Sequence, residues 1–172
     1  MLQLRGQPLA LKEIAEIASG KVRLELAPAA MAQMEASRRV VRRVAGEHVP
    51  VYGINTGFGK LCEVRIADDA IERLQLNLVR SHAAWVGEPL PRDQTRALMA
   101  ARINCLLKAH SGIRPEPVRL LADCLNRDVL PVIPSQGSVG GGSRSSVLLI
   151  RVPVPPTGYP VSGSRGPAAF MG

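Results

Sequence analysis

The chain has 172 residues and a formal net charge of +8, a length that suits one domain with a real core and excludes two large ones. Hydrophobic residues make up 46% of the sequence but aromatic residues only 3%, so aliphatic side chains must build the core, which favours helices. No run approaches 18 apolar residues, and the N-terminal stretch lacks the continuous apolar segment of a secretion signal. These features argue against a membrane protein and predict a cytoplasmic location.

The positive charge is unevenly distributed along the chain. Residues 141–172 hold three arginines and no other charged residue, so the first 140 residues carry 19 basic and 14 acidic groups. One predicted helix carries Arg38, Arg39, Arg42 and Arg43. Such a face could bind the phosphates of a nucleic acid. A solvated helix face is the favoured interpretation, because no aromatic side chain is interleaved for base stacking.

The cysteines do not form a recognisable framework. Cys62, Cys105 and Cys124 are odd in number and show no Cys-x-x-Cys spacing, so neither a disulfide network nor a zinc site is indicated. We expect reduced thiols and no metal centre.

Hydrophobic periodicity predicts a mainly helical chain. Apolar residues recur at helical spacing over 9–17, and Gly20 is placed to end that helix. The alternating segment 21–26 predicts a short strand. Further helices are predicted, in chain order, over 28–46, 68–84, 91–109 and 115–128. The first of these should direct Met31, Met34, Val41 and Val44 inward. Pro131 and Pro134 predict an extended or looping segment afterwards.

Residues 50–65, PVYGINTGFGKLCEVR, are too rich in turn residues for a helix. Tyr52 opens the motif, and Gly53, Gly57 and Gly59 allow a positive φ or close approach to a ligand, as mobile active-site lids require. A buried structural turn would use similar residues. The spacing alone leaves both interpretations open.

Two further features have weaker signals. His82 lies toward the end of a predicted helix, in NLVRSHAAWVGEPLP, where a lone histidine is more often a packing residue than a catalyst. The glycine-rich stretch 137–143 lacks the lysine of a phosphate-binding loop, and no helix pattern follows it. Residues 141–172 contain six Gly, five Pro and five Ser, so we expect residues 1–140 to form the folded part and 141–172 a disordered tail.

Three motifs occur in order, VYGINTGFGKL, NLVRSHAAWVGEPLP and RALMAARINCLLKAHSGIRPEPVRLLADCLNRDVLPVIPSQGSVG. Together they resemble the N-terminal part of the histidine ammonia-lyases, a branch of the aromatic amino acid lyase family, over residues 1–140. The resemblance implies the N-terminal helical portion of a fumarase/aspartase-like fold, with a short strand and an active-site loop. It also implies an amino acid substrate, homotetramers whose active sites draw on several subunits, and non-oxidative deamination of L-histidine to trans-urocanate and ammonia.

The resemblance also assigns roles to individual residues. Tyr52 matches the base that removes the β-proton, Gly59 a glycine that lines the substrate pocket, and His82 the histidine that orients the substrate side chain. That proton is hardly acidic and ammonia leaves poorly, so a base alone cannot lower the barrier enough. The family uses a built-in electrophile, a methylidene-imidazolone (MIO), which Ala-Ser-Gly forms by cyclisation and loss of water.

The chain departs from the family at that triad. The matching positions are Gly141, Gly142 and Ser143, followed by Arg144. Gly142 has no hydroxyl to lose, and a shift of one residue places Arg144 where the ring-closing glycine is needed. We therefore expect no MIO and no activity from this chain alone, and the tail composition suggests a frameshift, recombination or sequencing error. The alternatives are a non-catalytic partner of a full-length lyase and, less favoured, a nucleic-acid-binding protein.

Overall fold

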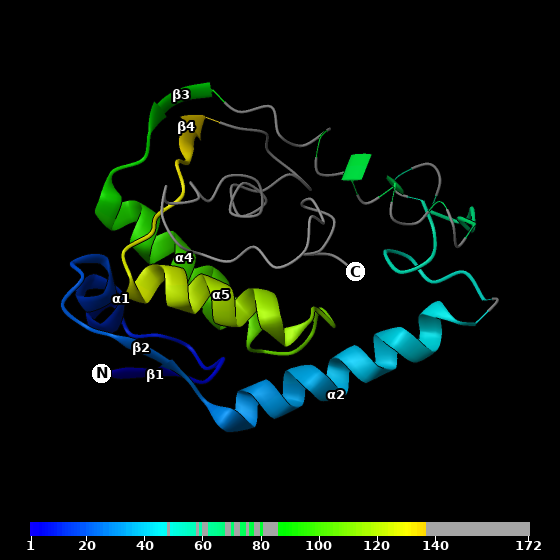
Figure 1. Cartoon of the computed structure of the whole chain (residues 1–172), viewed down its shortest axis with the longest axis horizontal. Coiled ribbons are helices and arrows are strands. Elements are labelled where there is room, and N and C mark those ends of the chain that lie inside the picture. Colours follow the sequence, from blue (N-terminus) through cyan, green and yellow to red (C-terminus); the bar gives the residue numbers. More distant parts are fainter. Residues whose placement is uncertain are drawn as a thin grey trace.

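The structure is a computed structural model, and it describes residues 1–47, 49–57, 59, 62–67, 70, 73, 74, 76, 77, 80 and 86–136. Within that part the helices are α1 (Leu11–Ala18), α2 (Pro28–Ala45), α4 (Arg92–Leu106) and α5 (Pro115–Asn126). The strands are β1 (Leu2–Leu4), β2 (Leu24–Leu26), β3 (Val86–Pro89) and β4 (Pro134–Gln136). The described part is mainly helical, as predicted, with two small sheets at its edges (Figure 1).

The first helix ends where the sequence indicates, but it begins at Leu11 and so two residues later than the apolar pattern over 9–17. The Glu13 carboxylate accepts the N–H of Ala10 at 2.7 Å at the start of α1, and Gly20 follows its end with φ of 75°. The predicted strand is shorter than expected, Leu24–Leu26, and pairs in parallel with β1. Sequence analysis missed β1, because three residues are too few to show an alternating pattern.

Helix α2 begins with Pro28 at its first turn, where the missing N–H removes no helical hydrogen bond. Of the residues expected to face inward, Met31 and Met34 are buried, whereas Val41 and Val44 are half-buried. The second half of α2 extends away from the other helices (Figure 1). The prediction of a helix over 28–46 is therefore confirmed, with a core-facing side that weakens toward its C-terminal end.

The core lies where α1, α4 and α5 pack together. Its members are aliphatic, as the scarcity of aromatics predicts, and they include Leu4, Ile17, Met34, Met99, Ile103, Leu107, Val118, Leu125 and Ile133, each almost fully buried. Arg96 also lies here, only 4% exposed. Its Nε donates to the carbonyl of Ile17 at 2.9 Å, and its Nη1 donates to the carbonyl of Leu125 at 3.1 Å. The guanidinium thus joins the ends of α1 and α5.

Two asparagine side chains join distant segments through backbone groups. The Asn126 Oδ1 accepts the N–H of Leu24 at 2.8 Å and its Nδ2 donates to the carbonyl of the same residue at 2.9 Å. Asn104 accepts the N–H of Gly6 at 3.0 Å and donates to the carbonyl of Gln7 at 2.7 Å. Each amide therefore pairs backbone groups of a segment about 100 residues earlier in the chain.

A second sheet pairs β3 with β4 in antiparallel orientation. The extended segment predicted around Pro131 and Pro134 is confirmed, whereas β3 was not predicted. The helix predicted over 68–84 falls largely outside the described residues, as does everything from 137 onward. Among the described helices, none combines the length and hydropathy needed to cross a membrane.

Candidate active-site loop

The loop predicted over 50–65 is tied together at its base. The carbonyl of Asn55 accepts the N–H of Ile66 at 2.9 Å, and the N–H of Gly57 donates to the carbonyl of Val64 at 3.0 Å. Thr56 forms an antiparallel bridge with Arg65 between these two hydrogen bonds. Residues 55–57 and 64–66 therefore pair in a short antiparallel bridge within the predicted loop, and Tyr52 lies before this bridge in the chain.

The Asn55 side chain, 1% exposed, organises the approach to Tyr52. Its Oδ1 accepts the N–H of Val51 at 2.7 Å, and its Nδ2 donates to the carbonyl of Val49 at 3.0 Å and to that of Glu47 at 3.4 Å. This role of Asn55 was not predicted. The only signal in the sequence was a polar Asn-Thr pair between the glycines of the motif, and the structure shows that both side chains are buried.

The expected positive φ occurs at two of the three glycines. Gly53 has φ of 78° and Gly59 has φ of 60°, and no heavy atom lies within 4 Å of where a Cβ would stand on either. These two positions need glycine for backbone conformation rather than for space. Gly57 does not adopt a positive φ; it is buried and acts through the hydrogen bond to Val64.

Tyr52 and Gly59 line the same pocket, which has a volume of about 580 Å³. The other lining residues are Pro50, Cys62 and Glu63. Tyr52 is 62% exposed, whereas Asn55, three residues later, is buried. The loop thus presents a phenol, a thiol and a carboxylate to a space of small-molecule size.

The pocket is open to solvent, because the five residues that line it, Tyr52 and Glu63 among them, are all exposed. Sites for small molecules bury most of the surface of their ligand. A ligand held here would need a further surface to enclose it. The described residues therefore line one side of an open pocket.

The other predicted site residues cannot be added to this pocket. His82 and the altered positions Gly141, Gly142 and Ser143 lie outside the described residues. Within the described part, no group of three or more His, Cys, Asp or Glu side chains is placed to hold a metal ion.

The family model described as aromatic amino acid lyase matches residues 9–144. The chain belongs to the aromatic amino acid lyase family. Among curated relatives, it is 52% identical over 147 residues to a histidine ammonia-lyase of Stigmatella aurantiaca and 51% identical over 143 residues to one of Myxococcus xanthus. These matches cover 86% and 83% of this chain, but only 29% and 28% of the relatives, in their N-terminal part.

Solved structures of this lyase family confirm the fold. The histidine ammonia-lyase of Trypanosoma cruzi matches with a TM-score of 0.76 and 39% identity, over 86% of this chain and 28% of that one. A tyrosine aminomutase from Streptomyces globisporus matches with a TM-score of 0.79 and 32% identity, over the same shares. Lyases and aminomutases therefore share this helical architecture, so the fold by itself does not fix the reaction.

Proposed function

We propose that this chain is an incomplete histidine ammonia-lyase, which carries the loop wall of a histidine-deaminating site and is inactive alone. The observation that carries the proposal is the roughly half-identical match to histidine ammonia-lyases across most of the chain. In this proposal Tyr52 removes the β-proton, Gly59 lines the pocket and His82 orients the imidazole. The shared pocket of Tyr52 and Gly59 supports the first two roles.

The loop geometry suits a base that must reach into a ligand space. A general base acts only within hydrogen-bond reach of the proton it removes. Tyr52 stands on the pocket while buried Asn55 holds the preceding backbone. Gly59 lines the same pocket and adds no side chain to it. These residues can place a phenolic oxygen against a small amino acid.

The residues that would form the electrophile do not fit the family group. MIO needs a serine hydroxyl at the middle of its triad and a glycine nitrogen to close the ring, and this chain has Gly141-Gly142-Ser143-Arg144. No reaction step is therefore assigned to that group here. Without it, base catalysis by Tyr52 faces the full difficulty of expelling ammonia.

The test is an assay of the purified chain with L-histidine, followed by the ultraviolet absorbance of trans-urocanate. A full-length histidine ammonia-lyase serves as the positive control. The expected result is no product above the rate without protein. Urocanate formation that disappears in the Tyr52→Phe variant would overturn the claim of inactivity while supporting the role of Tyr52.

A second function, as a non-catalytic partner of a full-length lyase, is favoured by the open pocket beside Tyr52. Its test is co-purification of the tagged chain with an untagged full-length histidine ammonia-lyase, and a rate measurement on the complex. Stable association with a changed kcat supports this function. Complete separation on a sizing column argues against it.

A further inference from the structure

The packing of α2 against the start of α5 brings three arginines together. Arg38 and Arg42 are one helical turn apart on α2, and Arg114 immediately precedes α5. The Arg38 Nη1 donates to the carbonyl of Gly112 at 3.5 Å. A Cβ on Gly112 would collide with Val41 on α2. The loop before α5 is therefore pressed against α2 beside Arg38, which is half-buried, whereas Arg42 is exposed.

Two of these guanidinium groups keep buried donors without acceptors. The Nε atoms of Arg38 and Arg114 are buried and have no hydrogen-bond partner within the described residues. Native proteins pair nearly all such donors. Arg96 provides the comparison inside the same chain, since its Nε and Nη1 donate to two carbonyls and a carboxylate. The Nε of Arg96 thus has an acceptor, whereas the Nε atoms of Arg38 and Arg114 have none within the described residues.

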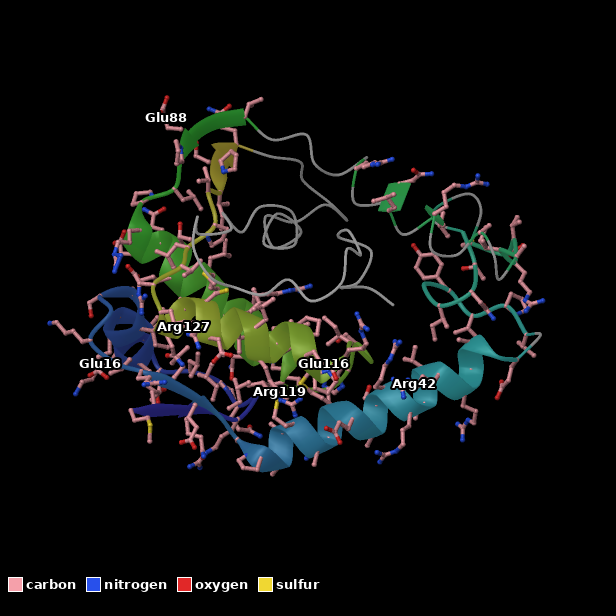
Figure 2. The ribbon with its side chains drawn as sticks, viewed as in Figure 1. Glu16, Arg42, Glu88, Glu116, Arg119 and Arg127 are labelled. Atoms are coloured by element: carbon pink, nitrogen blue, oxygen red, sulfur yellow. The ribbon has the colours of Figure 1, made fainter. Side chains whose placement is uncertain are left out.

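The positive charge of this cluster is only partly compensated. Figure 2 labels Arg42 on α2 and Glu116 in the first turn of α5. Burial, and then the neighbouring Arg42 and Arg114, lower the pKa of Arg38, whereas Glu116 raises it. None of the three arginines is in an ion pair within the described part of the chain, while Arg119 and Glu35 on the same two helices are 3.8 Å apart. Around Arg38, two neighbouring guanidinium groups are thus balanced only in part by the carboxylate of Glu116.

The N-terminus of α5 adds to this positive field, because helix dipoles favour anions there. Pro115 and Pro117 remove two of the backbone N–H groups that usually bind such an anion. The guanidinium groups must therefore supply most of the donors. Arginine is suited to that role, because its planar fork matches the oxygens of phosphates and carboxylates.

We propose that Arg38, Arg42 and Arg114 form a binding site for a single oxyanion group, a phosphate or a carboxylate, at the junction of α2 and α5. The site is separate from the pocket at Tyr52, and none of its residues lines that pocket. Two further arginines of α2, Arg39 and Arg43, are exposed and are not part of this site.

The test is a calorimetric titration of the full chain with inorganic phosphate, at constant ionic strength maintained with chloride because screening weakens any charge interaction. The expected result is saturable binding, weakened about tenfold or more by Arg38→Gln or Arg114→Gln, since each removes a charge-assisted hydrogen bond. The matched control is Arg39→Gln, which makes the same change of charge on the exposed side of α2 and should bind normally.

Arg42 is exposed, so Arg42→Gln should weaken phosphate binding without disturbing the packing of the helices. This variant keeps the test valid if Arg38→Gln or Arg114→Gln misfolds. Circular dichroism checks the helix content of each variant. Acetate in a parallel titration distinguishes the source of the anion. Binding of both ligands indicates a general oxyanion site, and binding of phosphate alone indicates a phosphate-bearing ligand. Non-saturable binding, or equal weakening in Arg39→Gln, would overturn the proposal in favour of a general effect of net charge.

Discussion

The side chain of Asn55 accepts the backbone N–H of Val51 at 2.7 Å, one residue before Tyr52. The Asn55 side chain thus takes the place of a backbone acceptor for this N–H, and its Nδ2 donates a hydrogen bond to the carbonyl of Val49. The position of Tyr52 therefore depends on a residue three positions later in the chain. This coupling makes the loop a preorganised wall rather than a loose connection.

Replacing Asn55 with Ala should loosen this loop. The change removes two partly buried hydrogen bonds, to the N–H of Val51 and the carbonyl of Val49, and each contributes about 0.5–1.5 kcal/mol. Hydrogen exchange should accelerate at Val51 and Ile54, measured by mass spectrometry on loop peptides. The matched control is Asn126→Ala, which removes a similar pair of bonds to Leu24 and should leave the loop unchanged. Equal acceleration in both variants would contradict local organisation by Asn55.

Arg96 and Arg92 both contact Asp128, but their substitutions should differ. Arg96→Met removes a 4% exposed guanidinium with several acceptors, and the free energy of unfolding should fall by about 3 kcal/mol. Arg92→Met breaks an ion pair whose side chains are 60% and 41% exposed, so the expected loss is about 0–1 kcal/mol. Urea denaturation of the two variants measures this difference. Similar losses would refute the structural role of Arg96.

Gly6 and Gly53 should respond differently to alanine, although both have a positive φ, of 76° and 78°. At Gly53 only the backbone conformation opposes a Cβ, which costs roughly 1–2 kcal/mol. At Gly6 the Cβ would also stand 2.9 Å from the backbone carbon and oxygen of Leu107, adding about 1–3 kcal/mol of overpacking. Thermal unfolding of Gly6→Ala and Gly53→Ala compares them. A greater loss at Gly53 would contradict the packing described around Leu107.

Cys124 should make stability depend on alkaline pH. Burial raises the pKa of its thiol, with a smaller contribution in the same direction from the Asp123 carboxylate. The unfolded chain then loses the thiol proton at a lower pH than the folded chain does. This contribution to stability is therefore fully present below the unfolded pKa and is lost as the pH rises through the raised one.

The measurement is the free energy of unfolding between neutral and alkaline pH for the wild type and Cys124→Ala. Loss of packing should lower the free energy of unfolding of Cys124→Ala by the same amount at every pH. Apart from this offset, the free energy should decline less at alkaline pH in the variant than in the wild type. Cys105→Ala is the control, because Cys105 is exposed, and it should keep the wild-type slope. Parallel curves for the wild type and Cys124→Ala would contradict the effect of burial on the thiol.

The helices could be predicted because their signals are local. Pro28 and Pro115 begin α2 and α5, and Gly20 follows α1, as their capping preferences indicate. One strand could also be predicted, because the alternating segment 21–26 indicates β2. The pairing of the strands could not, since β1 pairs with β2 from 22 residues away and β3 pairs with β4 across two helices.

The candidate site could likewise be predicted only in part. Composition indicates the loop and its glycines, and family resemblance singles out Tyr52. The importance of Asn55 was missed, because its partners depend on where residues 47–51 run in space. Arg96 was missed for a related reason: its acceptors come from the ends of α1 and α5. The usable signal was its helical spacing of three residues from buried Met99 and seven from Ile103.

The central claim, that this family member lacks the means to form the electrophile, is tested most directly by intact-mass spectrometry with peptide mapping of residues 137–172. Cyclisation of the triad removes water, so it lowers the mass of the peptide that contains it. The expected result is the unmodified mass and peptides that read Gly141-Gly142-Ser143-Arg144. A peptide lighter by the loss of water, or one that reads Ala-Ser-Gly at this place, would contradict it.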